Sequence, residues 1–224
     1  MSTFTFQGLG VRVVFIAACC AALPAMAVEP DLSSPQAALK SLNRAVEMQD
    51  GNAVLKIFYT ANDEERGLAQ AFADLILAAR KLSDAEKSNY GVAGDVPANG
   101  VMSVDELSHL DRAEVKISGD TATMLPVGRL RVIQFHLTQD RWQLVIRDFA
   151  NAEENLPRQV TILKKVTQVF ENVAGEIAAG KFTTSQEAEA AIQTRLATVM
   201  IKAATQATGK PTTKPTTKPT TKPG

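Results

Sequence analysis

The sequence has few residues of the kinds that form disulfide bonds or hold metals. Only two of its 224 residues are cysteine, Cys19 and Cys20, and both lie in an N-terminal segment that we expect to be removed. A mature chain without thiols has no disulfide, no thiolate nucleophile and no cysteine ligand for zinc. The two histidines, His109 and His136, are too few for a histidine-rich metal site. We therefore expect neither a metal nor another cofactor.

Clustered positive charge is lacking from the body of the chain. The formal net charge is zero, but Arg12 and the four lysines of the C-terminal tail account for five of the 24 basic residues. The remaining 19 stand against all 24 acidic residues, which gives the segment between the two ends a net charge of about −5. Binding to a phosphate backbone needs clustered lysine and arginine, so nucleic acid is not expected as a partner.

The short motifs that mark common enzyme classes are absent as well. The sequence contains no calcium-binding Asp-x-Asp-x-Asp-Gly loop, no glycine-rich phosphate loop, no Gly-x-Ser-x-Gly elbow and no His-Glu-x-x-His zinc motif. Each of these motifs places particular groups around a substrate or an ion. Their absence favours a binding function over catalysis.

The N-terminus has the pattern of a secretion signal over residues 1–27. Arg12 precedes an apolar run over residues 13–18, and the segment ends in Ala25-Met26-Ala27, which places small residues where signal peptidase cleaves. We expect cleavage after Ala27, so that the mature chain begins at Val28. The apolar run is too short to span a bilayer, and no transmembrane segment is expected in the mature chain.

A second interpretation of this leader involves Cys19. The tetrad Ile16-Ala17-Ala18-Cys19 resembles a bacterial lipobox, which would make Cys19 the lipidated first residue of a lipoprotein. Both interpretations predict an exported protein. The first places it in the periplasm or outside the cell, and the second anchors it to a membrane.

The C-terminal residues 209–224 repeat Lys-Pro-Thr-Thr with a period of four. Proline at every fourth position prevents helix formation and strand pairing, and the repeat has no apolar side chain to bury, so it predicts a disordered tail. The tail is either a solubilising extension or a functional one, through O-glycosylation of its threonines or adhesion to an anionic envelope polymer.

Residues 28–208 are expected to form a single domain that begins with helices. Ser34-Pro35 supplies a cap and a first-turn proline for a helix that stops at Asp50-Gly51. Asn52 caps a short helix over residues 53–59, and the acidic residues 63–65 open a third, long helix. A glycine-rich loop over residues 91–100 follows, and then a brief helix from Ser103.

A change of hydrophobic period marks the start of a sheet. Apolar and polar residues alternate from Ala113 onward, and Ser118-Gly119-Asp120 turns the chain into a second strand over residues 121–125. A second hairpin pairs residues 129–138 with residues 141–149. A helical hairpin over residues 155–204 completes the chain. The predicted class is α+β, with N-terminal helices packed on a four-stranded antiparallel sheet and followed by a C-terminal helical hairpin.

The same alternation divides the sheet into an apolar face, which carries Trp142 as a core residue, and a polar face. The polar face contains Glu114, Lys116, Thr121, Gln134, His136, Gln143 and Arg147. It is either an ordinary solvated face or a pocket wall or partner surface. All of them except Thr121 are the candidate binding residues, and His136 and Arg147 are the candidates for catalysis.

Four segments together resemble the NTF2-like superfamily over residues 34–149. They are Ser34-Pro35-Gln36-Ala37-Ala38-Leu39, Gln49-Asp50-Gly51-Asn52-Ala53, Ser118-Gly119-Asp120-Thr121-Ala122-Thr123 and Arg141-Trp142-Gln143-Leu144. The resemblance implies a cone with a pocket, in which the leading helices pack into the concave face of a curved antiparallel sheet. Members range from isomerases and dehydratases to non-catalytic binding or scaffold domains, so the resemblance alone does not fix an activity.

Three functions are consistent with the sequence. The first is an exported, non-catalytic domain that binds a small ligand or a protein partner in the cell envelope. The second is a small lyase- or isomerase-type enzyme that uses the polar sheet face, with His136 as acid or base and Arg147 holding an anion. The third is a structural envelope protein that is attached through its tail and whose domain only forms a homodimer.

Overall fold

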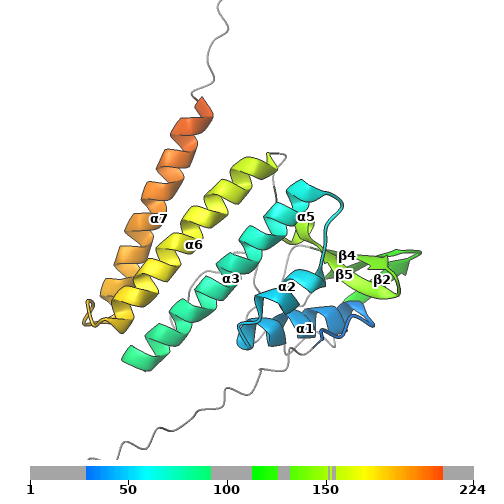
Figure 1. Cartoon of the computed structure of the whole chain (residues 1–224), viewed down its shortest axis with the longest axis horizontal. Helices are drawn as coiled ribbons and strands as arrows, with labels where there is room; N and C mark the ends of the chain where they lie inside the picture. Colours follow the sequence, from blue (N-terminus) through cyan, green and yellow to red (C-terminus); the bar gives the residue numbers. More distant parts are fainter. Residues whose placement is uncertain (1–28, 92–112, 126–131, 151, 153–154, 209–224) are drawn as a thin grey trace, which may run out of the picture.

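The computed structural model describes residues 29–91, 113–125, 132–150, 152 and 155–208 (Figure 1). Within them the fold is α+β, as predicted, with six helices and one five-stranded mixed sheet. No helix in these ranges is both long and apolar enough to cross a membrane. The predicted leader with Ala27 and Cys19, the loop after Gly91, the helix at Ser103, and the tail lie outside the described residues.

The first helix forms where its cap predicts it. Helix α1 spans Pro35–Glu47, and the Ser34 Oγ accepts a hydrogen bond from the Ala37 backbone N at 3.1 Å. Proline at the first helical position gives up no hydrogen bond, because that N–H has no partner inside a helix. The predicted start is therefore confirmed.

The second helix begins and ends earlier than the sequence indicated. Helix α2 spans Gly51–Ile57, and its cap is Asp50, whose Oδ1 accepts from the Ala53 backbone N at 3.0 Å. The prediction that Asn52 caps this helix is wrong. Phe58–Tyr59 form a short strand, β1, because the apolar Phe58 pairs with a strand far along the chain and is buried there.

Helix α3, Asp63–Tyr90, is the longest element and begins at the predicted position. Asn62 Oδ1 accepts from the Glu65 backbone N at 2.9 Å, and Glu65 Oε2 accepts in return from the Ala61 backbone N at 2.8 Å. This reciprocal pair satisfies two donors that have no partner inside the helix. It accounts for the burial of the Glu65 carboxylate.

The two predicted hairpins are present, and β1 is an additional strand that pairs with β5 at one edge of the sheet. The strands are β2 Glu114–Ser118, β3 Thr121–Leu125, β4 Ile133–Thr138 and β5 Arg141–Val145. Their order is β1-β5-β4-β3-β2, with β1 parallel to β5 and all other pairs antiparallel. The sheet is therefore five-stranded and mixed, and the expected four-stranded antiparallel sheet is its larger part.

The last strand is shorter than predicted. It was expected to extend to Phe149, but Ile146–Phe149 form a helical turn, α5. Ile146 and Phe149 are both buried. Residues three apart share one face of a helix and lie on opposite faces of a strand, so only the turn buries both side chains.

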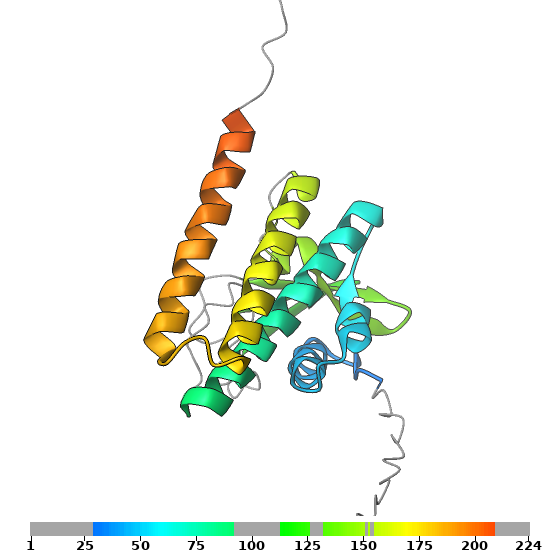
Figure 2. The same cartoon turned by 60° about the vertical axis from the view of Figure 1, so that its left-hand side comes forward.

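The C-terminal helical hairpin is confirmed. Helix α6 spans Leu156–Ala178 and helix α7 spans Ser185–Thr208. In two views, α6 lies between α3 and α7, and the three helices form one layer (Figures 1 and 2). The sheet, α1 and α2 lie on the α3 side of this layer, so α7 is the helix farthest from the sheet.

Two hydrophobic clusters meet along α3. One joins α1, α2, the first half of α3, the inner face of the sheet and α5, and it contains Trp142 as predicted. The other joins the second half of α3 to α6 and α7. Leu75 packs against both clusters. Because α3 crosses from one cluster to the other, we expect the helical layer and the sheet to unfold together.

The α6–α7 turn has a carboxylate-dependent cap. Glu187 Oε2 accepts from the backbone N and from the Oγ1 of Thr183, each at 2.8 Å, and the Thr184 Oγ1 accepts from the Glu187 backbone N at 3.2 Å. The two bonds from Thr183 lower the pKa of Glu187 below its ordinary value of 4.5. A lowered folded-state pKa stabilises the protein above pH 4.5, and this contribution is lost as the pH falls through the folded-state value.

Replacing Glu187 with alanine is therefore expected to destabilise the protein at pH 7 and to destabilise it less at pH 3. Urea unfolding of both proteins across this range measures the difference. Glu189→Ala, at an exposed position two residues further along α7, is the control, and its difference from the original protein should stay small at both pH values. A Glu187→Ala penalty that persists unchanged at pH 3 would contradict the assignment.

Candidate functional site

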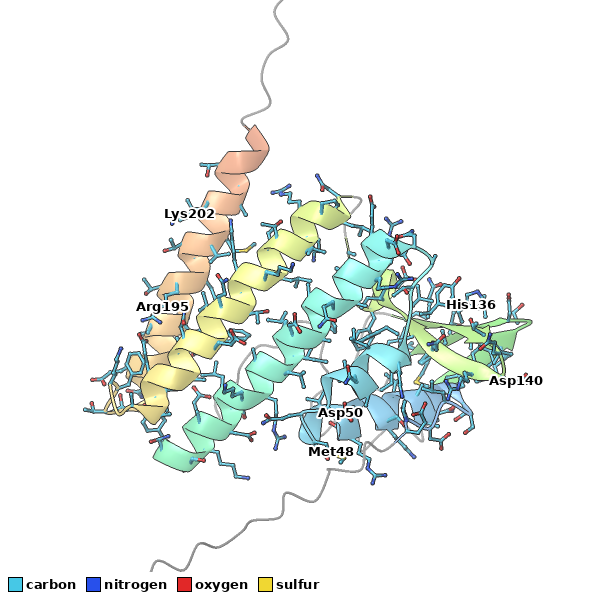
Figure 3. The ribbon with its side chains drawn as sticks, viewed as in Figure 1. Met48, Asp50, His136, Asp140, Arg195 and Lys202 are labelled. Carbon is cyan, nitrogen blue, oxygen red and sulfur yellow. The ribbon has the colours of Figure 1, made fainter. Side chains whose placement is uncertain are left out.

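The sheet register gathers most of the predicted polar residues on one face, which we call the outer face. His136 lies opposite Thr121 on one side and Gln143 on the other, and Gln134 lies opposite Thr123. Lys116 also pairs with Thr123, and Glu114 is two residues before it on the same strand face. Figure 3 shows His136 on the sheet, at the opposite side of the molecule from α7.

His136 is at the centre of the outer face, and Tyr59 packs against it. The two ring centroids are 4.2 Å apart with an interplanar angle of 49°. Tyr59 reaches this position from β1, where it pairs with Val145 of β5. No local pattern in the sequence indicates this contact, and the predicted helix over residues 53–59 placed Tyr59 at a helix end.

The hydrogen-bonding groups of His136 are unused within the described chain. Its Nδ1 is buried and has no hydrogen-bond partner among the described residues. Nor does any described residue bond its Nε2, although Tyr59 contacts the ring. A buried polar atom without a partner is uncommon in folded proteins. Among the described residues, the half-buried imidazole is thus in contact with the Tyr59 ring and has no hydrogen-bond partner.

Gln143 has a structural use of its own. Its Nε2 donates to the Lys56 backbone oxygen at 2.8 Å, and the Phe58 backbone oxygen lies 3.5 Å away. These contacts fasten the end of α2 and the start of β1 to β5. Gln143 therefore helps to bring Tyr59 to His136, and it is less available to a partner than Gln134, which is exposed.

An ion cluster that was not predicted from the sequence lies at the start of β5, around Arg141. Glu29 accepts from Lys56 Nζ at 2.7 Å and from Arg141 Nη2 at 3.1 Å. The hydrogen bond from Lys56 and then the one from Arg141 lower the pKa of the Glu29 carboxyl. Glu29 and Arg141 are 112 residues apart, so no sequence spacing could have related them.

Three predicted site residues lie apart from His136. Glu114 and Lys116 form an exposed ion pair at 3.3 Å on β2, two strands from β4 and thus about 10 Å away at the usual strand spacing. Arg147 is not on the outer face. It lies in α5, because the chain leaves the sheet after Val145 to bury Ile146 and Phe149, and the prediction that it shares a face with His136 is wrong.

The other end of the outer face is apolar. Leu125 and Val132 are 46% and 49% exposed. The β3–β4 register pairs Met124 with Ile133, and continuing it by one residue places Leu125 and Val132 opposite each other. The outer face thus combines exposed aliphatic groups, an aromatic ring and polar groups, and protein interfaces combine an aromatic-rich core with a polar rim.

The described residues offer little for catalysis or metal binding at this face. A histidine that acts as a general base is usually oriented by a third group such as a carboxylate. Among the described residues no carboxylate forms a hydrogen bond with His136, and the ring that packs against it is that of Tyr59. The parts of the chain that the structure describes also hold no group of three or more His, Cys, Asp or Glu side chains that could bind a metal.

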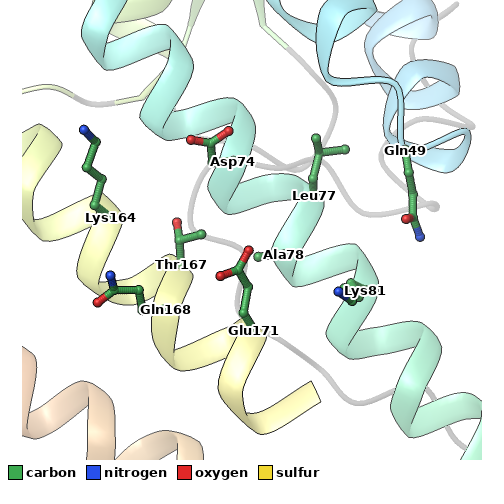
Figure 4. A pocket seen from close by; sticks show the side chains of 9 residues that line it. All are labelled: Gln49, Asp74, Leu77, Ala78, Lys81, Lys164, Thr167, Gln168 and Glu171. Carbon is green, nitrogen blue, oxygen red and sulfur yellow. The ribbon is translucent and has the colours of Figure 1, made fainter. Parts of the chain in front are cut away.

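One hollow among the described residues lies elsewhere, between α3 and α6. It is an open groove of about 430 Å³ (Figure 4), lined by Gln49, Asp74, Leu77, Ala78, Lys81, Lys164, Thr167, Gln168 and Glu171. Its two amines and two carboxylates balance in charge. None of these residues stood out in the sequence, because all but Gln49 are ordinary positions along the long helices α3 and α6.

No family model, curated protein or solved structure matches this chain. The resemblance to the NTF2-like superfamily therefore stays a prediction. The function has to be argued from the outer face itself.

Proposed function

We propose that this protein is an exported, non-catalytic domain whose outer sheet face binds a protein partner in the cell envelope. The observation that carries the proposal is the arrangement at His136. Its imidazole is fixed by Tyr59, and neither ring nitrogen has a hydrogen-bond partner in the described chain. Gln134 is exposed two residues before it on the same face, and Leu125 and Val132 are exposed at the other end of this face, so a partner surface has groups to bond and to pack against.

A protein partner fits this face better than a small ligand. Small-molecule sites are concave and bury most of the ligand. The groove of Figure 4 is on the helical layer, and two further hollows adjoin α1. The inner face, where an NTF2-like cone would have its pocket, is filled by buried side chains that include Phe135, Met124 and Leu144.

An NTF2-like origin is part of the proposal. Helices α1 to α3 precede the four antiparallel strands, and residues of all three pack against the inner face. This is the order and packing that the resemblance implies. The C-terminal hairpin is an addition to that plan, and it covers the second half of α3.

The proposal includes cleavage after Ala27. Glu29, two residues later, is already bound by Lys56 and Arg141, and Leu32 O accepts from the Trp142 backbone N at 2.8 Å. Cleavage at Ala27 would leave these contacts within the mature chain. It would also remove both cysteines.

Native mass spectrometry of the protein purified from its own host tests processing and binding together. We expect a chain that begins at Val28, carries no stoichiometric small molecule, and includes a fraction bound to another envelope protein. A lipid-modified Cys19 would overturn the cleavage site. A stoichiometric small-molecule adduct, with no protein partner, would overturn the proposed kind of ligand.

A further inference from the structure

Strand β2 ends the sheet, and no strand of the described residues pairs with its outer edge. It is the outermost strand of the order β1-β5-β4-β3-β2, and four of its five residues are exposed. Ile117 is 61% exposed although it lies on the apolar side of the strand. Exposed edge strands readily pair with other strands unless proline, a bulge or unmatched charge prevents it. β2 contains no proline, and its Glu114 and Lys116 are of opposite sign.

The turn that follows β2 determines which backbone groups face the free edge. Gly119 and Asp120 form a two-residue turn with Gly119 at φ 61°, and Ser118 pairs with Thr121. The residues that flank such a turn form a hydrogen-bonded pair. Hydrogen-bonded pairs alternate along an antiparallel ladder, so Ser118, Lys116 and Glu114 point their backbone groups toward β3. Val115 and Ile117 therefore direct theirs outward.

We propose that β2 pairs with β2 of a second copy of this chain, antiparallel, with Val115 opposite Val115. In this register the two Val115 residues exchange both backbone hydrogen bonds across the two-fold axis. Glu114 of each copy lies opposite Lys116 of the other, which forms two cross-strand pairs of opposite charge. Ile117 of each copy packs beside Ala113 of the other.

Charge selects this register over its neighbour. If the two-fold axis passes through Lys116 instead of Val115, Val115 of each copy lies opposite Ile117 of the other and their backbone groups can still bond. This register also places the two Lys116 side chains directly opposite each other. Like charges in that position are destabilising, and opposite charges stabilise. The β2 sequence is thus complementary to itself in one register. The dimer would join two sheets into one and place both outer faces on the same side.

The test uses sedimentation velocity on the full chain, expressed in an exporting host, over a range of protein concentrations. We expect a concentration-dependent dimer. Lys116→Glu and Glu114→Lys should each weaken association roughly tenfold, because either change turns both charge pairs into repulsions. An equimolar mixture of the two variants should form a heterodimer with nearly the original affinity, since every pair in it is again of opposite charge.

Either of two results would overturn the proposal. One is a chain that stays monomeric up to high concentration. The other is a dimer whose affinity in both variants equals that of the original protein, which would place the interface elsewhere, for example on α7, where Met200 and Ile201 are exposed.

Circular dichroism of each variant checks that it is folded. Both variants should be folded, because the Glu114–Lys116 ion pair is exposed and contributes little to stability. The outcome is independent of whether His136 binds a partner.

Discussion

Replacement of Phe72 with alanine is expected to lower the free energy of unfolding by about 3–5 kcal/mol. Phe72, in α3, is 1% exposed and makes edge-on contacts with Phe58 at 5.8 Å and with Phe149 at 5.6 Å. Phe58 and Phe149 also contact each other at 5.7 Å. These three rings join α3, β1 and α5, so removing the Phe72 ring leaves a cavity where the three elements meet.

Chemical denaturation followed by circular dichroism measures this loss. Gln70→Ala is the matched control, since Gln70 is exposed on the same helix and its Nε2 donates to the Asp74 Oδ1 at 2.8 Å. We expect the control to change stability by less than about 0.5 kcal/mol. A Phe72→Ala penalty close to that of the control would contradict the packing of β1 and α5 against α3.

Phe170→Ala tests whether the helical layer and the sheet form one cooperative unit. Phe170 is buried in the cluster of α3, α6 and α7, apart from the aromatic residues around Phe72. The expected loss is again about 3–5 kcal/mol. Because α3 extends through both clusters, we expect this loss to appear in the sheet as well as in the helices.

The single tryptophan makes that expectation measurable. Trp142 lies in β5 within the other cluster, so its fluorescence reports on the sheet while far-UV circular dichroism reports mainly on the helices. In Phe170→Ala the two probes should give the same unfolding midpoint, both shifted from the original. Separate midpoints, with fluorescence unshifted, would show that residues 28–208 contain two folding units instead of one.

Local signals explain which elements the sequence predicted correctly. Ser34 before Pro35, Asn62 before three acids, and Thr184 before Glu187 each act within one helical turn, so their positions can be read without knowing the rest of the fold. The hairpin turns are equally local. The errors at the end of α2, at β1 and at α5 have another cause, because Phe58 and Phe149 pack against residues that are distant in sequence.

The candidate site also contains features that local patterns predicted and features that depend on distant contacts. Strand alternation predicted that Gln134, His136 and Gln143 share a face, since the period of two is a property of any strand. It could not predict the packing of Tyr59 on His136, which depends on the parallel pairing of β1 with β5. The prediction for Arg147 was wrong because alternation does not reveal where a strand ends.

Site-specific photo-crosslinking in the exporting host tests the central proposal most directly. A photoreactive residue at Gln134, exposed on the outer face, should give a defined adduct with an envelope protein, and His136→Ala should reduce its yield. The same residue at Gln186, exposed on α7, serves as the control and should give no such adduct. An adduct of equal yield at both positions, or none at Gln134 while the protein is exported and folded, would contradict the account.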